Sequence, residues 1–384
     1  MSHSTHFDCL LVGGGLQNAL IAMALLDRRP STRFALIERE SRLGGNHLWC
    51  FHAQDLPPEA RPFVEPLVAY RWPAYQVIFP NLTRRLELDY AGITSDRLHQ
   101  VVRERIAASG SAAIFHGTAV EKVAASTVVL ADGRTLEGAL VVDSRGPERL
   151  QASGRVAYQK FVGLEVALTE PRAGFLPRLM DACVSQTDGY RFFYTLPLAP
   201  DRFLVEDTYF SDTPDLDREN LRREILTYAQ RIGLGVADVV REESGVLPLT
   251  TRSDSTAIRE GVLLGGYAGG WFHPTTGYSF PVALRLALHI SSLDTREVLG
   301  TGWDRLLAHR QSQAGFFNLL NRMLFGAMPP AERWNVFERF YRLPEMTIRR
   351  FYAMDITMAD RLRLLVGRPP RGISLRAALE QVLK

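Results

Sequence analysis

The beginning of the chain alternates short apolar runs with a stretch of helical spacing. Residues 7–12 form an apolar run that leads into three consecutive glycines, residues 19–26 repeat apolar side chains at helical intervals, and residues 33–37 form a second apolar run. Short apolar runs bounded by glycine or charge are typical of buried strands. The pattern predicts a strand, a helix and a second strand, which is how a Rossmann-type sheet begins.

Further along the chain the pattern predicts helices in some stretches and strands in others. The helical stretches are residues 95–109, with Ser95 or Asp96 as the cap, 218–232, 279–290 and most of the chain after residue 301. The strand-like stretches are residues 112–140, which contain a turn at Asp132-Gly133, 140–143, 156–208 and 261–266. Strands and helices mixed in this way predict an α/β (α+β mixed) fold.

The glycines after the first run carry the first chemical signal. Gly13 and Gly15 allow the backbone to turn tightly and approach a pyrophosphate, and the following helix, from Leu16, directs its N-terminus at that group. Glu38 closes the second strand, where an acidic side chain accepts hydrogen bonds from a ribose hydroxyl. Asn18 stands where a complete GxGxxG motif has its third glycine, so a tight turn without a ligand is the alternative.

A second glycine segment favours FAD among the dinucleotides. Arg42-x-Gly44-Gly45 follows the second strand, as is typical of FAD enzymes of the glutathione-reductase type. Glu38 would repel the 2′-phosphate of NADP. The sequence therefore predicts FAD as the cofactor.

A third segment, residues 264–278, is rich in glycine. Gly266 stands where many flavin hydroxylases carry an Asp, and Pro274-x-x-Gly277 leads into the helix at 279, whose positive end would stabilise an anionic reduced flavin. A structural glycine loop is the alternative. The predicted cofactor-binding residues are Gly13, Gly15, Leu16, Glu38, Arg42, Gly44, Gly45, Asp143, Gly265, Gly277 and Tyr278.

These segments predict three regions in the chain. A Rossmann-type FAD-binding domain of the glutathione-reductase or hydroxylase type is expected to carry an inserted β-rich substrate domain and a helical C-terminal region. The FAD-binding domain is assigned to residues 1–50, 91–155 and 245–300, the substrate-binding sheet domain to 51–90 and 156–244, and the helical region to 301–384.

Composition narrows the class of protein. A chain of 384 residues, 46% of them hydrophobic, can bury a large core, which excludes a disordered protein and a small disulfide scaffold. Cys9, Cys50 and Cys183 are odd in number and form no CxxC pair, which favours reduced cysteines in a cytosolic protein. The N-terminus shows no signal-peptide pattern. The uncharged residues 261–284 contain six glycines, so they are not expected to span a membrane.

At this point the chain resembles the bacterial lycopene β-cyclases, flavoproteins of carotenoid biosynthesis. The resemblance covers most of the chain and is carried by residues 13–16 (GGGL), 44–52 (GGNHLWCFH), 142–146 (VDSRG), 203–208 (FLVEDT) and 272–278 (FHPTTGY).

The resemblance implies an isomerisation. Each acyclic ψ-end of lycopene is protonated, closes to a six-membered ring through a carbocation and loses a proton, giving γ-carotene and then β-carotene. It also implies FAD in its reduced form, with NAD(P)H as the external reductant and no net redox change in the substrate. An anionic reduced flavin could stabilise a nearby cation or relay a proton.

The resemblance assigns the essential acid to Glu206. Alternation along a strand at 203–208 places Leu204, Glu206 and Thr208 on one face, and Phe203, Val205 and Asp207 on the other. An apolar pocket would raise the pKa of a carboxyl and keep its proton available. Asp207 is predicted as a supporting catalytic residue. A solvent-facing Glu at a strand end is the alternative.

A carbocation favours electron-rich walls. Aromatic residues and histidines close to the predicted flavin are the candidates for the substrate and cation pocket, although core packing is the alternative for each. They are His47, Trp49, Phe51, Trp271, Phe272 and His273. No histidine spacing supports a metal site.

Charge is unevenly distributed along the chain. Residues 301–384 carry 14 Lys and Arg against 7 Asp and Glu, whereas the rest of the chain carries 31 against 35. Apolar and aromatic side chains alternate with arginines between residues 315 and 350, which favours helices that lie on a membrane surface, from which lycopene and other acyclic carotenoids would be drawn. An ordinary packed helical subdomain is the alternative. No motif supports nucleic-acid binding. The expected location is the bacterial cytoplasm, on the inner face of the cytoplasmic membrane.

Two other functions compete with the cyclase. A flavin hydroxylase of the same fold would consume oxygen and NAD(P)H in proportion to product. A membrane-bound carotenoid carrier would bind pigment without turnover, and replacement of Glu206 would leave that binding intact.

Overall fold

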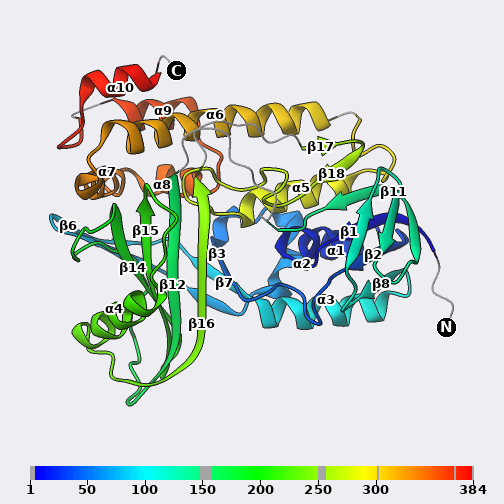
Figure 1. The fold of residues 1–384 in the computed structure, drawn as a ribbon, viewed down its shortest axis with the longest axis horizontal. Helices are drawn as coiled ribbons and strands as arrows, with labels where there is room; N and C mark the ends of the chain where they lie inside the picture. The colour runs from blue at the N-terminus through cyan, green and yellow to red at the C-terminus, as the bar shows by residue number, and fades with distance from the viewer. Residues whose placement is uncertain (1–4, 147–156, 250–256, 301, 367–368, 383–384) are drawn as a thin grey trace.

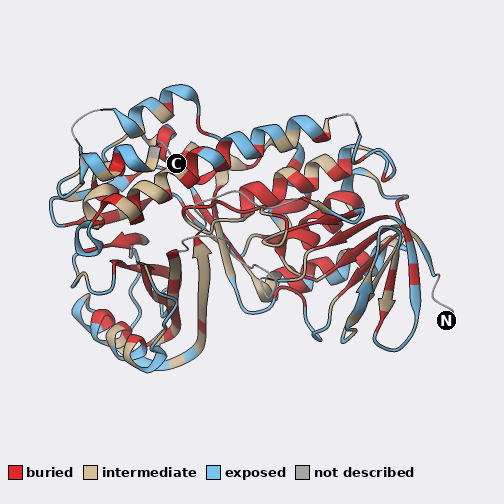
Figure 2. Ribbon diagram, turned by 45° about the horizontal axis from the view of Figure 1, so that its top comes forward, coloured by how far each residue is buried: buried red, intermediate tan, exposed pale blue. Residues whose placement is uncertain are grey.

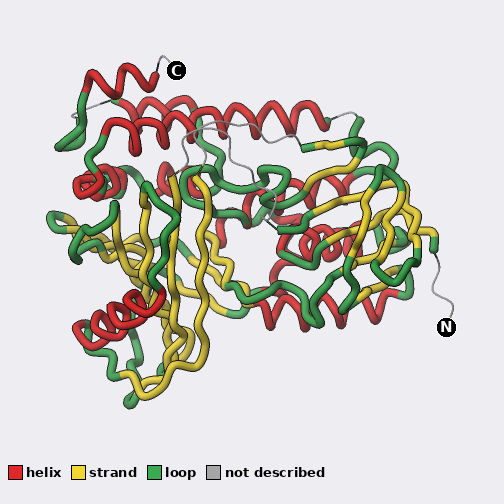
Figure 3. Tube along the Cα trace, viewed as in Figure 1, coloured by secondary structure: helices red, strands yellow, loops and turns green. Residues whose placement is uncertain are grey.

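Two large sheets and a layer of helices make up the protein (Figure 1). The computed structural model describes residues 5–146, 157–249, 257–300, 302–366 and 369–382. Figure 3 shows the strands gathered in two groups, with the helices of the C-terminal region running along the top of both. This mixed architecture confirms the predicted fold class.

The first sheet is built around the parallel strands predicted from the beginning of the chain. Its strands are, in order of pairing, β17 (Ile258–Arg259), β18 (Val262–Leu264), β11 (Thr135–Asp143), β1 (His6–Val12), β2 (Phe34–Ile37) and β8 (Ala112–Phe115), with β10 (Thr127–Leu130) and β9 (Val120–Val123) attached to β11. Strand β1 pairs in parallel with both β2 and β11, as in a Rossmann-type sheet.

Three helices cover one face of this sheet, and β9 and β10 cover the other. The helices are α1 (Leu16–Arg28), α3 (Ser95–Ser109) and α5 (Phe280–Ser292). Every residue of α1 from Leu16 to Leu25 is buried, because α1 lies between the sheet and its two neighbouring helices (Figure 2). A helix that is apolar on all sides has to be enclosed in this way.

The cap predicted for α3 was wrong by one residue. Thr94 caps the helix, and its hydroxyl accepts a hydrogen bond from Arg97 N at 3.1 Å. The Ser95 hydroxyl instead donates to the carbonyls of Gly44 and His47, each at 3.0 Å, and so ties the Gly44–His47 loop to α3.

The second large sheet is almost wholly antiparallel. Its strands are, in order of pairing, β16 (Val236–Leu249), β12 (Ala157–Leu168), β15 (Arg202–Ser211), β14 (Tyr190–Ala199), β13 (Arg178–Asp181), β5 (Tyr75–Phe79) and β6 (Leu82–Leu86). Helix α4 (Arg218–Arg231) covers one face. The predicted boundary between residues 155 and 156 lies outside the described residues, and β16 continues in this sheet beyond residue 244, where the substrate domain was expected to end.

A small third sheet and a short helix lie between the two large sheets. The sheet consists of β3 (Leu48–His52), β7 (Tyr90–Thr94) and β4 (Tyr70–Trp72), and helix α2 (Arg61–Val64) lies in the connection between β3 and β4. Trp72 donates from its indole nitrogen to Pro197 O on β14 at 2.9 Å, which links the small sheet to the second large sheet.

The C-terminal region is helical, as predicted. It consists of α6 (Trp303–Ala327), α7 (Trp334–Phe340), α8 (Glu345–Tyr352), α9 (Met358–Leu365) and α10 (Leu375–Val382). Phe337 of α7 stacks on Tyr190 of the second sheet with ring centroids 4.1 Å apart. Within the part of the chain that the structure describes, no helix combines the length and apolarity needed to cross a bilayer.

The two faces of β15 differ as the sequence alternation predicted. Phe203, Val205 and Asp207 face the core under α4, whereas Leu204 belongs to the large core on the opposite side. Asp207 is completely buried, and Arg191 of β14 binds both of its carboxylate oxygens at 3.0 and 2.7 Å. The charge of Asp207 is therefore neutralised inside the second large sheet. We call this sheet the substrate sheet, because most of its strands lie in the predicted substrate domain.

We expect Asp207→Ala to lower the free energy of unfolding by about 3–5 kcal/mol, because it leaves the buried Arg191 without its main partner. Urea unfolding followed by circular dichroism would measure the change. Glu224→Gln is the matched control: it removes the half-exposed second partner of the same arginine and should cost less than about 1 kcal/mol. Equal losses in the two variants would contradict the expectation.

Candidate active site

The turn between β1 and α1 forms an open cradle. Gly13 has φ +94°, and a side chain there would press on the backbone of Ser144. A methyl group at Gly15 would meet no protein atom within 4 Å. No side chain caps the N-terminus of α1, which leaves its first amide groups directed at this open space.

Glu38 lies beside this turn at the end of β2, as predicted. Its Oε2 accepts a hydrogen bond from Gly14 N at 2.6 Å, and its Oε1 accepts one from Glu40 N at 2.9 Å. The carboxylate is thus held at the rim of the cradle, where a ribose would lie next to the pyrophosphate.

Asn18, which stands in place of the third glycine, has a structural role. It is completely buried, and its amide nitrogen donates to the carbonyls of Val12 and Gly13, both at 2.9 Å. Its Oδ1 accepts from the Ser144 hydroxyl at 2.9 Å. Asn18 therefore fixes the strand-to-helix turn by hydrogen bonds, where the complete motif relies on close packing of a glycine.

The Arg42-x-Gly44-Gly45 segment continues the cradle. Both glycines have positive φ, and Gly44 N donates to Gly14 O at 3.0 Å. Arg42 is exposed and pairs with Asp96 at the start of α3 at 2.6 Å. The structure thus joins the two predicted glycine segments and places Arg42 on their outer side.

A third glycine turn follows β18. A side chain at Gly265 would overlap the Ser144 hydroxyl and press on Gln17 of α1, so the turn lies against the cradle. Gln17 Oε1 is buried and has no hydrogen-bond partner within the described chain, although its Nε2 donates to Ala283 O at 3.0 Å. An acceptor left unpaired beside three glycine turns fits a bound polar ligand.

Asp143 is engaged by protein groups. Its two carboxylate oxygens accept hydrogen bonds from Arg145 at 2.9 and 2.7 Å, and its carbonyl accepts one from Gly265 N at 2.9 Å. The structure therefore places Asp143 as a support for the adjoining turn, and its role in binding the cofactor stays a prediction. Taken together, the cradle, Glu38 and Gln17 fit an FAD molecule.

Gly277 and Tyr278 lie where the cradle meets the second sheet. A side chain at Gly277, which has φ +67°, would touch Gln159 of β12 and Leu247 of β16 at 3.1 Å. Tyr278 donates from its hydroxyl to Tyr90 OH at 2.9 Å. The close approach of Gly277 to β12 and β16 places the predicted flavin segment beside this edge of the substrate sheet.

Glu206 lies on the face of β15 that points toward this junction, as predicted. The Thr208 hydroxyl donates to Glu206 Oε1 at 2.6 Å. Loss of hydration in the folded protein raises the pKa of Glu206 to about 8, and the charge of Glu243 adds to this shift, while the Thr208 hydrogen bond opposes it. Among the described residues no basic side chain pairs with Glu206, so the carboxyl keeps its proton at neutral pH.

A second carboxylate, which the sequence analysis did not identify, lies on the same face. Gly163 of β12 is directly opposite Glu206 on β15 and directly opposite Glu243 on β16. Residues in register on neighbouring strands direct their side chains to the same side. The alternation of side chains along β16 could suggest which face Glu243 is on. It cannot predict that Glu243 is in register with Gly163 and Glu206, because that depends on how strands far apart in the sequence pair.

Glu243 is held by a basic residue of its own strand. Arg241 Nη1 lies 3.0 Å from Glu243 Oε2, and Arg241 Nε lies 3.0 Å from Glu165 Oε2. Arg241 also donates to Asn46 of the Gly44–His47 loop, and Asn46 Nδ2 donates to Glu242 O at 3.0 Å. The loop that continues the cradle therefore contacts the strand that carries the second carboxylate.

Tyrosine side chains from separate elements lie beside Glu206 and at the adjoining junction. Tyr194 of β14 is directly opposite Glu206, and Tyr352 of α8 lies 5.5 Å from Tyr278 between ring centroids. Burial holds the pKa values of Tyr90, Tyr194 and Tyr278 well above their usual range, so these rings stay neutral. Neutral, electron-rich rings can attract a cation without being ionised.

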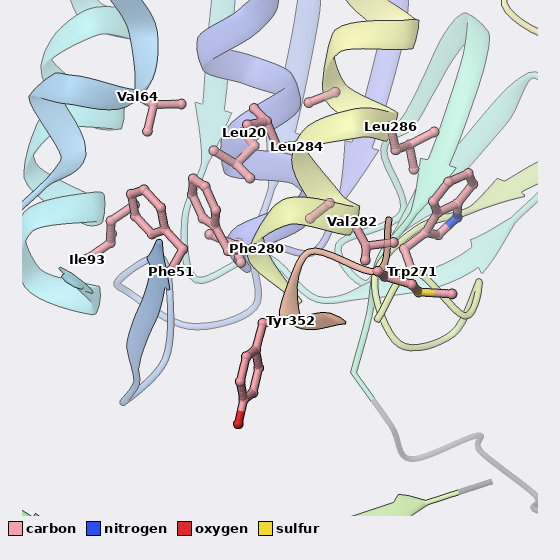
Figure 4. Close-up of a cluster of buried hydrophobic side chains, with 14 of the residues drawn as sticks. Leu20, Phe51, Val64, Ile93, Trp271, Phe280, Val282, Leu284, Leu286 and Tyr352 are labelled. Carbon is pink, nitrogen blue, oxygen red and sulfur yellow. The ribbon is translucent and has the colours of Figure 1, made fainter. Parts of the chain in front are cut away.

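Four of the predicted pocket residues lie in the protein core. Phe51 stacks on Phe280 of α5 with centroids 3.8 Å apart, and Trp271 donates to Leu264 O at 2.9 Å under Arg310 of α6. Phe272 stacks on Tyr267. In Figure 4, Phe51 and Trp271 lie among the core side chains, whereas Tyr352 points away from them. Core packing, the alternative considered for these aromatics, is what the structure shows.

His273 is the fourth of these residues. It is completely buried, its Nε2 lies 2.9 Å from Phe351 O, and its Nδ1 accepts a hydrogen bond from Thr275 N. Loss of hydration lowers the pKa of His273 to about 3, so the ring is neutral and ties the glycine-rich loop to α8.

His47 and Trp49 lie at the cradle. A Cβ added at Gly44 would lie 3.4 Å from the ring of Trp49, and one added at Gly45 would lie 3.7 Å from the ring of His47. The centroids of the two rings are 5.5 Å apart. These two residues border the predicted cofactor position. Their role toward the substrate stays a prediction.

A family model and two bacterial relatives match nearly the whole chain. The family model described as lycopene cyclase protein matches residues 8–378. A lycopene beta-cyclase of Pantoea ananas is 41% identical over 382 residues, which cover 98% of each chain, and one of Pseudescherichia vulneris is 42% identical over 391 residues, which cover 97% of each.

A solved structure with a similar fold is PqsL, a probable FAD-dependent monooxygenase from Pseudomonas aeruginosa. It has a TM-score of 0.58 and 19% identity, and the alignment covers 82% of this chain and 93% of that one. At this identity the likeness shows the fold alone.

We expect Gly15→Val to reduce the FAD content of the purified protein by tenfold or more, because its side chain would enter the open space of the cradle, where a Cβ meets no protein atom within 4 Å. Flavin released by denaturation would be measured by absorbance. Gly315→Val is the control, since Gly315 of α6 is also unobstructed but lies outside the cradle. Full FAD content in Gly15→Val would show that the cradle binds something else.

Proposed function

The chain belongs to the lycopene cyclase family, its activity is the β-cyclisation of lycopene, and we propose that Glu206 donates the proton that starts ring closure. The observation that carries this proposal is a carboxyl at the junction of the cradle and the substrate sheet, bound by the Thr208 hydroxyl and without a basic partner among the described residues. Loss of hydration there raises the pKa of Glu206, which favours the protonated form. The family resemblance inferred from the sequence is confirmed by the full-length match.

The proton chemistry follows from the position of Glu206. Its proton adds to the terminal double bond of an acyclic end, the next double bond of the chain closes the ring onto the resulting cation, and loss of a proton restores a double bond. One proton enters and one leaves for each ring, so the substrate gains and loses no electrons. A carboxyl that is neutral at pH 7 suits the first step, since a general acid needs a pKa close to the working pH.

The cradle would hold FAD through the turns at Gly13–Gly15, Gly44–Gly45 and Gly265, with Glu38 at the ribose and Gln17 as a further polar partner. When bound and reduced, the flavin would supply an electron-rich group beside the developing cation. NAD(P)H is the proposed external reductant. It would be needed to reduce the flavin and would not be consumed in proportion to product.

The tyrosine walls stabilise the positive charge that forms after protonation. Tyr194 lies directly beside the acid, and Tyr90 and Tyr278 are joined through their hydroxyls. Each ring face contributes about 0.5–2 kcal/mol toward a nearby cation. Exclusion of water by the bound substrate and cofactor would protect the cation from addition of water.

The hydrocarbon substrate reaches the acid through the helical region. Side chains from the five helices α6 to α10 enclose a cavity of about 200 Å³. Side chains that are mostly apolar line it, among them Leu320, Met323, Val336, Phe340, Tyr352 and Leu364. Tyr352 lines this cavity and also lies beside Tyr278, so it borders both the cavity and the junction. An acyclic carotenoid end would pass this ring to reach Glu206.

The outer side of the same region binds the membrane surface. Six of the eight large hydrophobic side chains that are exposed in the described residues lie between residues 346 and 379. Met358, Leu362 and Leu365 lie on one face of α9, and Leu365 also lines the cavity. Figure 1 places α9 and α10 together at the top of the molecule, on the side of the substrate sheet.

Docking through this surface brings the cavity mouth to the bilayer. Exposed apolar side chains suit the interfacial layer of a bilayer. Arg363 and Arg376 lie beside them, each paired with a carboxylate of its own helix. The inner face of the cytoplasmic membrane is the proposed location.

We expect Glu206→Gln to lower the rate of ring formation by about 10²–10⁴-fold, since glutamine is similar in size but donates no proton of comparable acidity. Lycopene in liposomes would be incubated anaerobically with reduced holoenzyme, and products resolved by chromatography. In D₂O the unaltered enzyme should add one deuterium per ring.

Glu224→Gln is the matched control and should retain activity, because Glu224 lies on α4, which covers the opposite face of the substrate sheet. Ring formation by Glu206→Gln at the unaltered rate would contradict the proposed acid. If the unaltered protein forms no ring although its flavin is reduced, the cyclase is excluded, and oxygen-dependent consumption of NADPH would then separate a hydroxylase from a carrier.

We expect the double variant Met358→Glu/Leu362→Glu to bind vesicles roughly tenfold or more weakly, because each change removes an apolar side chain worth about 1.5–3 kcal/mol when buried. Co-sedimentation with vesicles of phosphatidylglycerol and phosphatidylethanolamine would measure binding. Val240→Glu is the control, as Val240 is exposed on β16 outside the surface. Binding of the double variant equal to that of the control would exclude α9 as the docking surface.

A further inference from the structure

The carboxyl group of Glu206 has a carboxylate neighbour that the proposed reaction does not yet use. Gly163 lies between Glu206 and Glu243 in the register of three adjacent strands. A methyl group at Gly163 would be 3.4 Å from Glu206 Oε2, 3.4 Å from Glu243 Oε1 and 3.1 Å from Glu243 Cγ. The two carboxyl groups therefore flank the same point on the sheet, and the absence of a side chain at Gly163 leaves the space between them open.

The partners of the two groups are different. Glu243 is buried, and Arg241 binds its Oε2 at 3.0 Å, which leaves Oε1 directed toward Gly163 and Glu206. Glu206 accepts a hydrogen bond from the neutral Thr208 hydroxyl. Two carboxylates that share a site do not both ionise easily, and the one with a basic partner takes the charge.

We infer that Glu243 is a positioning residue for the cyclisation: its Arg241-bound carboxylate, facing Glu206 across Gly163, keeps the proton on Glu206 until an acyclic end is bound. The inference rests on the proposed role of Glu206 as the acid. It adds a function for Arg241, which fixes the charge on Glu243, and for Gly163, which sets the separation of the pair.

Other groups around Glu206 do not supply this charge. Tyr194 on β14 and the thiol of Cys50 on β3 are both held neutral by burial, which raises their pKa values. Asp207 points to the opposite face of β15 and is neutralised by Arg191. Arg241 on β16 is the nearby cation, and it is bound to Glu243 and Glu165. Burial also raises the pKa of Glu243, and Arg241 opposes that shift.

The test is the pH dependence of kcat/KM with lycopene in liposomes and fully reduced flavin. Activity of the unaltered enzyme should fall as pH rises through about 8, since the acid loses its proton there. Removal of a neighbouring negative charge makes ionisation of Glu206 easier, so Glu243→Gln should move this loss to lower pH by about one unit. The variant would then be roughly fivefold slower at pH 8 and nearly unchanged at pH 6.

Three further variants separate positioning from a structural role. Glu243→Asp retains the charge and should keep the loss of activity near pH 8. Gly163→Ala leaves every charge in place but separates the two carboxyl groups, and should move the loss in the same direction as Glu243→Gln. Glu242→Gln, on the opposite face of β16, where it pairs with Arg222, should leave the profile unchanged.

A profile of Glu243→Gln that is lowered equally at all pH values, with its midpoint unmoved, would overturn the inference and leave Glu243 as a support for β16. That outcome would not affect the proposed acid, because loss of turnover in Glu206→Gln is a separate result. If Glu206→Gln remains fully active, the proposed acid fails first and Glu243 has no proton to position.

Discussion

The proposed acid, Glu206, has to keep its proton among charged and polar neighbours, and this is the constraint on which the arrangement of the site depends. Glu206 lies where burial disfavours its anion, on a strand whose neighbours supply a hydroxyl and a second carboxylate. Any basic side chain in contact with Glu206 would stabilise the anion and remove the acid. The structure meets this requirement by binding Arg191 to Asp207 on one face and Arg241 to Glu243 on the other.

The same constraint makes the contacts between the two large sheets important. The loop at Gly44–His47 is fixed to α3 by Ser95 and reaches β16 through Asn46, while the turn at Gly277 presses on β12 and β16. These contacts come from the segments with the glycine motifs, and they end on the strands that carry Gly163 and Glu243. A displacement of the cradle relative to the substrate sheet would therefore alter the surroundings of the acid directly.

Local patterns in the sequence were enough to predict much of this. The strand, helix and strand at the beginning, the opposite faces of Glu206 and Asp207, and the glycine turns all depend on spacing of a few residues. What the spacing could not supply was tertiary register. Phe51 and Trp271 are aromatic residues in glycine-flanked segments, yet they pack into the core, because helices α5 and α6 lie over them. Glu243 and Tyr194 are brought beside Glu206 by the pairing of strands far apart in the sequence, so no local signal identifies them.

The C-terminal helices connect these observations to the nature of the substrate. They close the site from above, since His273 is bound to α8 and Tyr352 of the same helix lies beside Tyr278. They also enclose the apolar cavity and expose the apolar face of α9. A long hydrocarbon gains nothing by leaving a bilayer for water, so a path to Glu206, the proposed acid, has to be apolar throughout. The helical layer borders both the cavity and the tyrosines on the side of the proposed acid, which is the arrangement that such a path requires.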